Sequence, residues 1–251
     1  MAGLVYDKQG FPVVASEMAG VPGLSGAEVS IVHAARVSPG QHFFLRRAVA
    51  PAFAAIRSHL AEDASLVLHI SSAMPGEGVS TVARELAFIA GQAPWCSTLL
   101  LDGNPAGAGQ ASYFGLPPLP DVGRCVRVPS SSLEVMHVQS GESNFHVAAL
   151  PLNGSEAASV SEPGFLRQTY ARLKETFRLT IVDCPPIMTA PDTTALSGYS
   201  DGVIMVVEAE KTRIPVVVRA REEVENADGV VRGIVMNKRR HYIPAPIYKL
   251  L

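Results

Sequence analysis

The stretch Pro75-Gly76-Glu77-Gly78-Val79-Ser80-Thr81 decides the fold of this chain. It follows the short apolar run 66–71, which is typical of a buried strand, and precedes a helical pattern over 80–92. Glycines at such a turn let backbone N–H groups approach phosphate oxygens, and the helix N-terminus adds partial positive charge. The stretch therefore predicts a phosphate-binding loop in which Ser80 takes the position of a Mg²⁺ ligand.

Strand and helix patterns alternate on both sides of this loop. Further strands are predicted at 97–101, 146–150, 179–183, 202–207 and 231–236, and helices at 44–60, 165–177 and 215–226. Residues 103–140 are rich in Gly, Pro and Ser and give no clear pattern. The alternation predicts a three-layer α/β/α fold, with a doubly wound, mainly parallel sheet flanked by helices.

The length and composition of the chain suit one such domain between two tails. We predict the domain at 46–240, a poorly ordered arm at 1–45 and an extended, apolar tail at 241–251. A net charge of −2 gives no basic excess, so nucleic acid is not an expected partner. No apolar run approaches the roughly 18 residues of a membrane span. The three cysteines lack disulfide or zinc spacing, and the expected compartment is the cytoplasm.

Two acidic residues end predicted strands of this sheet. Asp102 follows the run 97–101, and Asp183 closes the run 179–183. Ligands of open α/β sheets sit beyond the carboxyl ends of the strands, so both acids are expected beside the glycine-rich loop. Together with Ser80 they would supply the oxygen ligands of a hydrated Mg²⁺. Either acid alone has an ordinary explanation as a turn or helix cap.

These ordered motifs resemble the bacterial tyrosine kinases of polysaccharide export, the Wzc/CpsD type, within the MinD/ParA class of P-loop proteins. In that family the loop reads Pro-Gly-Glu-Gly-Lys-Ser-Thr, the next motif reads Asp-x-Asp, and a later strand ends Asp-x-Pro-Pro. The corresponding stretches here are 75–81, 102–104 and 183–186, and the likeness spans 50–250.

The resemblance also implies which residues would bind the nucleotide and the metal. ATP or ADP would contact Asn237, after the last strand, and the loop residues Gly76, Glu77, Gly78, Val79, Ser80 and Thr81. Mg²⁺ would bind Ser80, Asp102 and Asp183, and the two acids are also the expected catalytic residues.

The sequence departs from the family pattern at the lysine that reaches the phosphates, where this chain has Val79. The missing charge-assisted hydrogen bond is worth about 1.5–3 kcal/mol, which corresponds to about 10- to 150-fold weaker nucleotide binding. The loss is larger in a phosphoryl-transfer transition state, where catalysis is mostly charge stabilisation and positioning. A lysine from elsewhere, Lys211 or Lys238, is the alternative source of this charge.

Three further departures touch metal binding, ring assembly and the phosphoacceptor. Asn104 replaces the second acid of the Asp-x-Asp motif. Of the family's ring-forming helix pattern, Glu-x-x-Arg-x-x-Arg-x-Asn, only Arg57 remains. The family's C-terminal tyrosine cluster is reduced to Tyr242 and Tyr248, which we interpret as packing residues. Catalysis by Asp102 and Asp183 is therefore expected to be vestigial, and ATP, ADP and Mg²⁺ to bind weakly or not at all.

The favoured hypothesis is a non-catalytic, kinase-like regulatory or scaffolding subunit of exopolysaccharide synthesis and export. Its partner would be a membrane-embedded chain-length or co-polymerase protein, through which the chain would lie at the inner membrane. The first alternative is a divergent ATP-dependent tyrosine kinase or ATPase with a substitute cation. The second is a MinD/ParA-like positioning module that self-associates and binds the membrane surface. Cys184 and His69 are interpreted as packing residues rather than as a redox switch or a catalytic base.

Overall fold

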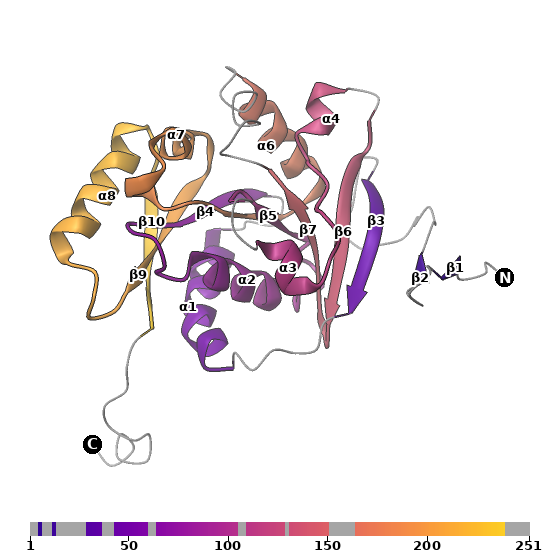
Figure 1. Cartoon of the computed structure of the whole chain (residues 1–251), viewed down its shortest axis with the longest axis horizontal. Helices are drawn as coiled ribbons and strands as arrows, with labels where there is room; N and C mark the ends of the chain where they lie inside the picture. Colours follow the sequence, from indigo (N-terminus) through magenta and orange to yellow (C-terminus); the bar gives the residue numbers. More distant parts are fainter. Residues whose placement is uncertain are drawn as a thin grey trace, which may run out of the picture.

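The computed structural model describes residues 5–6, 12–13, 29–36, 43–59, 64–104, 109–128, 131–150 and 164–238. Two short strands, β1 (Val5–Tyr6) and β2 (Pro12–Val13), pair antiparallel. The main sheet has eight strands in the order β10-β9-β4-β8-β5-β7-β6-β3. Helices cover both of its faces, so the predicted three-layer α/β/α fold is confirmed (Figure 1).

Strands β4, β5, β7, β8, β9 and β10 run parallel, whereas β6 pairs antiparallel with β7 and parallel with β3. The strands of the main sheet are β3 (Val29–Arg36), β4 (Leu66–Ser72), β5 (Thr98–Asp102), β6 (Leu133–Ser140), β7 (Ser143–Ala149), β8 (Leu179–Asp183), β9 (Gly202–Glu208) and β10 (Val231–Asn237).

The central strands are nearly continuous apolar runs because helices bury them from both sides. The helices are α1 (Phe43–His59), α2 (Val79–Ala90), α3 (Gln110–Phe114), α4 (Arg124–Arg127), α6 (Phe165–Thr176), α7 (Pro191–Thr194) and α8 (Ile214–Asn226), with the 3₁₀ turns η1 (Ile187–Thr189) and η2 (Ser197–Tyr199). Helices α1, α2 and α3 cover one face of the sheet, and α6 and α8 cover the other (Figure 1). Buried side chains of these helices belong to the hydrophobic clusters of the core.

Two predicted segments differ from the structure. Strand β3 lies within residues 1–45, the stretch predicted to be a poorly ordered arm; its β-branched run pairs with the edge of β6. Residues 103–140, left without a pattern, contain α3, α4 and β6. β6 alternates between buried and partly buried residues, but turn-forming residues on both sides obscure that period in the sequence. The predicted tail at 241–251, with Tyr242 and Tyr248, lies outside the described residues.

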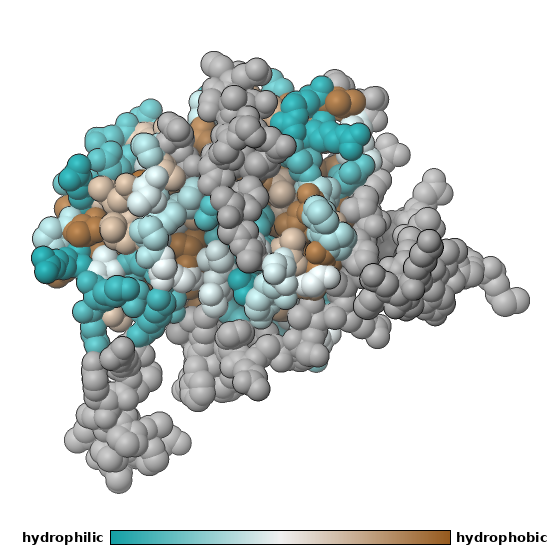
Figure 2. Space-filling model, in the orientation of Figure 1, coloured by the Kyte–Doolittle hydropathy of each residue, from teal (hydrophilic) through white to brown (hydrophobic). Residues whose placement is uncertain are grey.

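The visible surface is mixed rather than dominated by one kind of side chain. On the face drawn in Figure 2, hydrophobic groups lie between hydrophilic ones. In the described part of the chain, none of the helices combines the length and the apolar character that crossing a bilayer requires.

An aromatic cluster joins α2 and α3 to the hairpin strand β7. Phe88 lies edge-to-face with Phe145 at a centroid distance of 5.1 Å and with Phe114 at 6.0 Å. Phe88 and Phe145 are both fully buried, so this cluster adds side-chain packing to the parallel pairing of β7 with β5 in holding the β6–β7 hairpin to the rest of the sheet.

Phe88→Ala should lower the free energy of unfolding by about 3–5 kcal/mol, because it removes a buried ring and leaves a cavity. Urea unfolding monitored by circular dichroism measures the loss. Gln92→Ala, at an exposed position just after the same helix, is the control and should change stability by about 0.5 kcal/mol or less. A loss below about 1 kcal/mol for Phe88→Ala would contradict the packing role.

Candidate functional site

The glycine-rich loop between β4 and α2 keeps the backbone shape that the sequence predicts. Gly76 has φ 82° and Gly78 has φ 97°, both in the left-handed region that favours glycine. A Cβ atom on Gly78 would lie 2.2 Å from Asn237 Nδ2, so a side chain there would also displace the Asn237 side chain from the loop. Helix α2 begins directly after Gly78, and within the described residues its N-terminus has no side-chain cap.

Glu77 braces the loop from inside the protein. Its buried carboxylate accepts hydrogen bonds from the Met74 N–H at 2.8 Å, from the Glu208 N–H at 3.2 Å and from the Thr212 hydroxyl. The side chain of Glu77, one of the loop residues predicted to contact nucleotide, is thus hydrogen-bonded to other parts of the protein. The bonds tie the loop to the turn between β9 and α8.

The end of β10 holds the loop from the other side. Asn237 Nδ2 donates to the Glu77 carbonyl at 2.9 Å, so this residue, expected to contact the nucleotide, is bonded to the loop itself. The next residue, Lys238, has a left-handed φ of 57° and donates from Nζ to the Gly76 carbonyl at 2.5 Å. The structure therefore brings one of the two candidate substitute lysines to the loop.

Both candidate lysines share one carboxylate partner. Lys211 and Lys238 lie 3.1 and 3.2 Å from Glu208 Oε2, and their hydrogen bonds hold the pKa of this carboxyl below its usual range. The ammonium of Lys238 thus donates to the Gly76 carbonyl, and the Glu208 carboxylate neutralises its charge. Neither contact directs its charge toward the backbone N–H groups that would bind phosphate.

Val79, in place of the family's lysine, is part of the hydrophobic core under α1 and α2. Its apolar side chain is stabilised by removal from water. Ser80 and Thr81, the following loop residues, are partly buried at the start of α2. The valine therefore adds to packing and brings no charge to the loop.

Asp102 and Asp183 lie side by side, as expected for residues that end neighbouring parallel strands. They face each other in the register of β5 and β8, and both are buried. Asn104 has no carboxylate to offer a metal ion. Its backbone N–H donates to Asp102 Oδ1 at 3.2 Å.

Gln110, the first residue of α3, joins the two acids and was not predicted from the sequence. Its backbone N–H donates to Asp102 Oδ2 at 2.8 Å, and its side-chain Nε2 donates to Asp183 Oδ2 at 2.8 Å and to the Ser80 carbonyl at 3.3 Å. Arg84 Nε donates to Gln110 Oε1 at 3.0 Å, and the Arg84 guanidinium stacks on the Tyr113 ring. Gln110 is completely buried. No motif marks it, because it lies in the segment without a readable pattern.

Burial raises the pKa of Asp183 to about 6, while hydrogen bonding by Ser80 and Gln110 and the charge of Arg84 oppose the shift. The nearby Asp102 carboxylate raises it further. Among the described residues, Asp183 Oδ1 receives no hydrogen bond of good geometry, although the Ser80 hydroxyl lies near enough to affect its pKa. An under-solvated carboxylate at this position explains the direction of the shift.

This arrangement does not fit a hydrated Mg²⁺. Gln110 directs an N–H group at one oxygen of each acid, and the partial positive charge of an N–H group repels a cation. In the described part of the chain, no three His, Cys, Asp or Glu side chains gather as a metal site. Binding of Mg²⁺ through Asp102 Oδ2 and Asp183 Oδ2 would require Gln110 to leave both of them.

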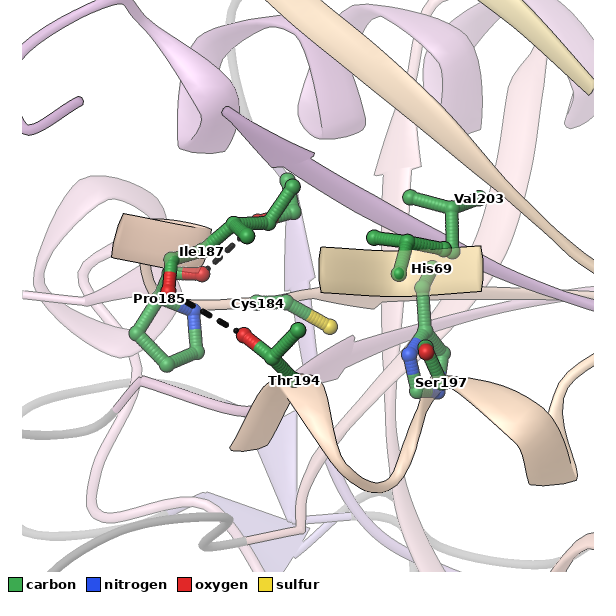
Figure 3. Close-up of a pocket in the computed structure, with 9 residues that line it drawn as sticks. His69, Cys184, Pro185, Ile187, Thr194, Ser197 and Val203 are labelled. Atoms are coloured by element: carbon green, nitrogen blue, oxygen red, sulfur yellow. Dashed lines mark hydrogen bonds between the residues drawn. The ribbon is translucent and has the colours of Figure 1, made fainter. Parts of the chain in front are cut away.

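A small cavity behind the end of β8 contains His69 and Cys184 (Figure 3). His69 Nε2 is hydrogen-bonded to the Tyr170 hydroxyl at 2.7 Å, and burial lowers the pKa of His69 to about 4. Burial also raises the pKa of the Cys184 thiol. The cavity holds about 10 Å³, space for about one water molecule. A neutral, bonded imidazole and a buried thiol agree with the packing roles predicted for both residues.

Comparisons with known proteins confirm the family resemblance. No protein-family model matches the chain. It is 27% identical over 202 residues to the tyrosine-protein kinase CpsD of Streptococcus agalactiae serotype III (strain NEM316), covering 74% of this chain and 81% of that protein. It is 26% identical over 174 residues to the tyrosine-protein kinase YwqD of Bacillus subtilis (strain 168), covering 68% and 71%.

Solved structures confirm the fold. The kinase domain of VpsO superposes with a TM-score of 0.67 at 23% identity, covering 80% of this chain and 97% of that domain. The kinase domain of the Escherichia coli tyrosine kinase ETK gives 0.61 at 16% identity, covering 83% and 92%. A Cyanothece McdA–ATP complex gives 0.52 at 22% identity over 68% and 70%.

Asp183→Asn should stabilise the protein near neutral pH. The folded-state pKa of about 6 lies above the ordinary value of 3.8, so the ionised carboxylate destabilises the fold above pH 6 by about 3 kcal/mol. As pH falls toward 4 the folded protein takes up the proton first, and this penalty disappears. Urea unfolding of both proteins should give a difference of about 3 kcal/mol at pH 7.5 and about zero at pH 4. A difference independent of pH would contradict the raised pKa.

Glu77→Ala should lower the free energy of unfolding by about 1–3 kcal/mol, because the Met74 and Glu208 N–H groups lose their acceptor. Glu77→Gln is the matched variant: it keeps one acceptor oxygen and should lose less. Thermal unfolding by calorimetry measures both. Equal losses would mean that the carboxylate charge, rather than acceptance of these bonds, holds the loop.

Proposed function

We propose that this chain, which is similar in sequence and fold to the bacterial tyrosine kinases, is a non-catalytic, kinase-like regulatory or scaffolding subunit of exopolysaccharide synthesis and export. The observation that carries the proposal is the position of Gln110, which donates to Asp102 and Asp183 where a kinase would need both acids for Mg²⁺. Burial of Val79 in the core supports it, because the loop lacks the charge that stabilises a transferring phosphoryl group.

The polar network of the site then has a structural role. Gln110 bonds to both acids, and Arg84 bonds to Gln110 and attracts the charge of Asp183. A buried carboxylate is stabilised by such donors and by a nearby cation. Under this proposal the Gln110 amide and the Arg84 guanidinium supply the hydrogen bonds and positive charge that Mg²⁺ and a lysine would supply in an active kinase. The network holds α3 against β5 and β8 without nucleotide.

The proposed partner is a membrane-embedded chain-length or co-polymerase protein, through which this chain would lie on the cytoplasmic side of the inner membrane. The resemblance to the tyrosine kinases of polysaccharide export motivates this choice, together with a kinase-like scaffold that lacks the expected lysine. Co-purification with a tagged membrane-embedded chain-length protein of the same organism would support the partner. Its absence from purified complexes of that protein would count against it.

A divergent ATP-dependent tyrosine kinase or ATPase is the second candidate. The observation in its favour is Lys238, whose Nζ reaches the Gly76 carbonyl of the loop. Movement of this side chain from Glu208 to a bound phosphate would restore a charge near the loop. Under this candidate Lys238→Ala abolishes Mg·ATP turnover, whereas under the leading proposal there is no turnover to lose.

Calorimetric titration with Mg·ADP tests the leading proposal. The unaltered chain and Val79→Lys should bind weakly or not at all, because Gln110 still occupies the acids. Gln110→Ala combined with Val79→Lys should bind at least about tenfold more tightly than Val79→Lys alone, since one carboxylate oxygen becomes free for the metal. Gln110→Ala alone is the control and should bind little, because the lysine is still missing.

Two results would contradict the proposal. One is tight Mg·ADP binding by the unaltered chain with no effect of Gln110→Ala. The other is autophosphorylation or phosphate release by the isolated chain that Asp183→Ala abolishes. In both, the acids and the loop would be working as a nucleotide site despite Val79.

A further inference from the structure

An apolar groove runs between α1 and β10, away from the glycine-rich loop. It encloses about 450 Å³ and is lined chiefly by Ala52, Ala55, Ile56, Leu68, Ile204 and Val235. The groove exists because α1 presents alanines toward β10, and these side chains are too short to fill the space. A hollow of this kind beside the edge strand of the sheet exposes apolar surface that soluble proteins usually cover.

The carboxylate at the polar end of the groove is already paired within the protein. Asp201 pairs with Lys174 at 2.7 Å and accepts the Val67 N–H at 2.7 Å. Arg232 donates from Nε to the Asp201 carbonyl at 3.1 Å. These contacts engage the charges at this end of the groove. The groove therefore favours an occupant with uncharged, apolar side chains.

The C-terminal end of the chain supplies apolar side chains for this groove. Residues 239–251 follow directly after β10 and the loop-binding Lys238; beside the basic Arg239, Arg240 and Lys249, they contain Ile243, Ile247, Tyr248, Leu250 and Leu251. Thirteen extended residues reach about 43 Å, whereas the seven residues of β10 span about 23 Å. The tail is long enough to return along β10 to the groove. Pro244 and Pro246 favour the extended backbone that this path needs.

We propose that the apolar residues of 239–251 dock in the groove between α1 and β10 of their own chain. A tethered segment is present at an effective concentration on the order of millimolar, which favours it over a tail from a second copy. Docking would also stabilise β10, the strand that carries Asn237 and Lys238 to the loop. The glycine-rich loop would then be held in place in part by the tail.

Photo-crosslinking in the full chain tests the docking. Ile247 is replaced by the photoreactive residue p-benzoylphenylalanine, the protein is irradiated, and the adduct is mapped by mass spectrometry. The expected adduct lies within one chain and joins the tail to peptides of α1 or β10. An adduct that joins two copies, an adduct elsewhere on the domain, or no adduct overturns the proposal.

A matched pair of variants on α1 provides the control. Ala55→Arg, on the wall of the groove, should reduce the adduct about tenfold or more, because a guanidinium in an apolar groove is unfavourable. Ala54→Arg, on the same helix but outside the groove lining, should leave the yield unchanged. Both positions are exposed, and calorimetry verifies that both variants fold. Equal yields from the two variants would overturn the proposal, whatever the result of the Mg·ADP titration.

Discussion

Two carboxylates buried side by side at the ends of β5 and β8 must find hydrogen-bond donors inside the protein. Parallel pairing places Asp102 directly opposite Asp183, so neither acid can move away without breaking the sheet. Gln110 donates a hydrogen bond to one oxygen of each acid, and these two bonds fix the start of α3. Arg84 of α2 donates to Gln110 and so fixes the position of α3 on α2. The raised pKa of Asp183 is the remaining sign that the pair is under-solvated.

The glycine-rich loop is stabilised in the same way, by groups of the protein rather than by a ligand. Glu77 binds the turn after β9, and Asn237 binds the loop from β10. Three strands therefore converge on one loop: β4 leads into it, and β9 and β10 hold it from the side. A preformed loop of this kind retains its shape without nucleotide, which suits a scaffold as well as it suits an enzyme.

Much of the fold could be predicted because its central strands are buried on both faces, and such strands read as apolar runs. The helices α1, α2, α6 and α8 and the parallel strands follow the predicted ranges to within a few residues. β3 and β6 could not be found in this way, because both lie among turn-forming residues, and β6 alternates between buried and partly buried positions instead of forming a continuous apolar run. In the site, the loop, Asp102 and Asp183 were identified by motif, whereas Gln110 has no motif and acquires its role from its neighbours in space.

The sequence by itself determined the α/β class, the loop, the two acids and the replacement of a lysine by Val79, since each is a local pattern of residue types. Only the tertiary structure decided what those groups do. In the folded protein Val79 is buried in the core, and Lys238 is bonded to Glu208 and to the Gly76 carbonyl. Gln110 lies between the two acids. The physical reason is that a hydrogen bond or an ion pair depends on distances between residues far apart in the chain, which no local pattern specifies.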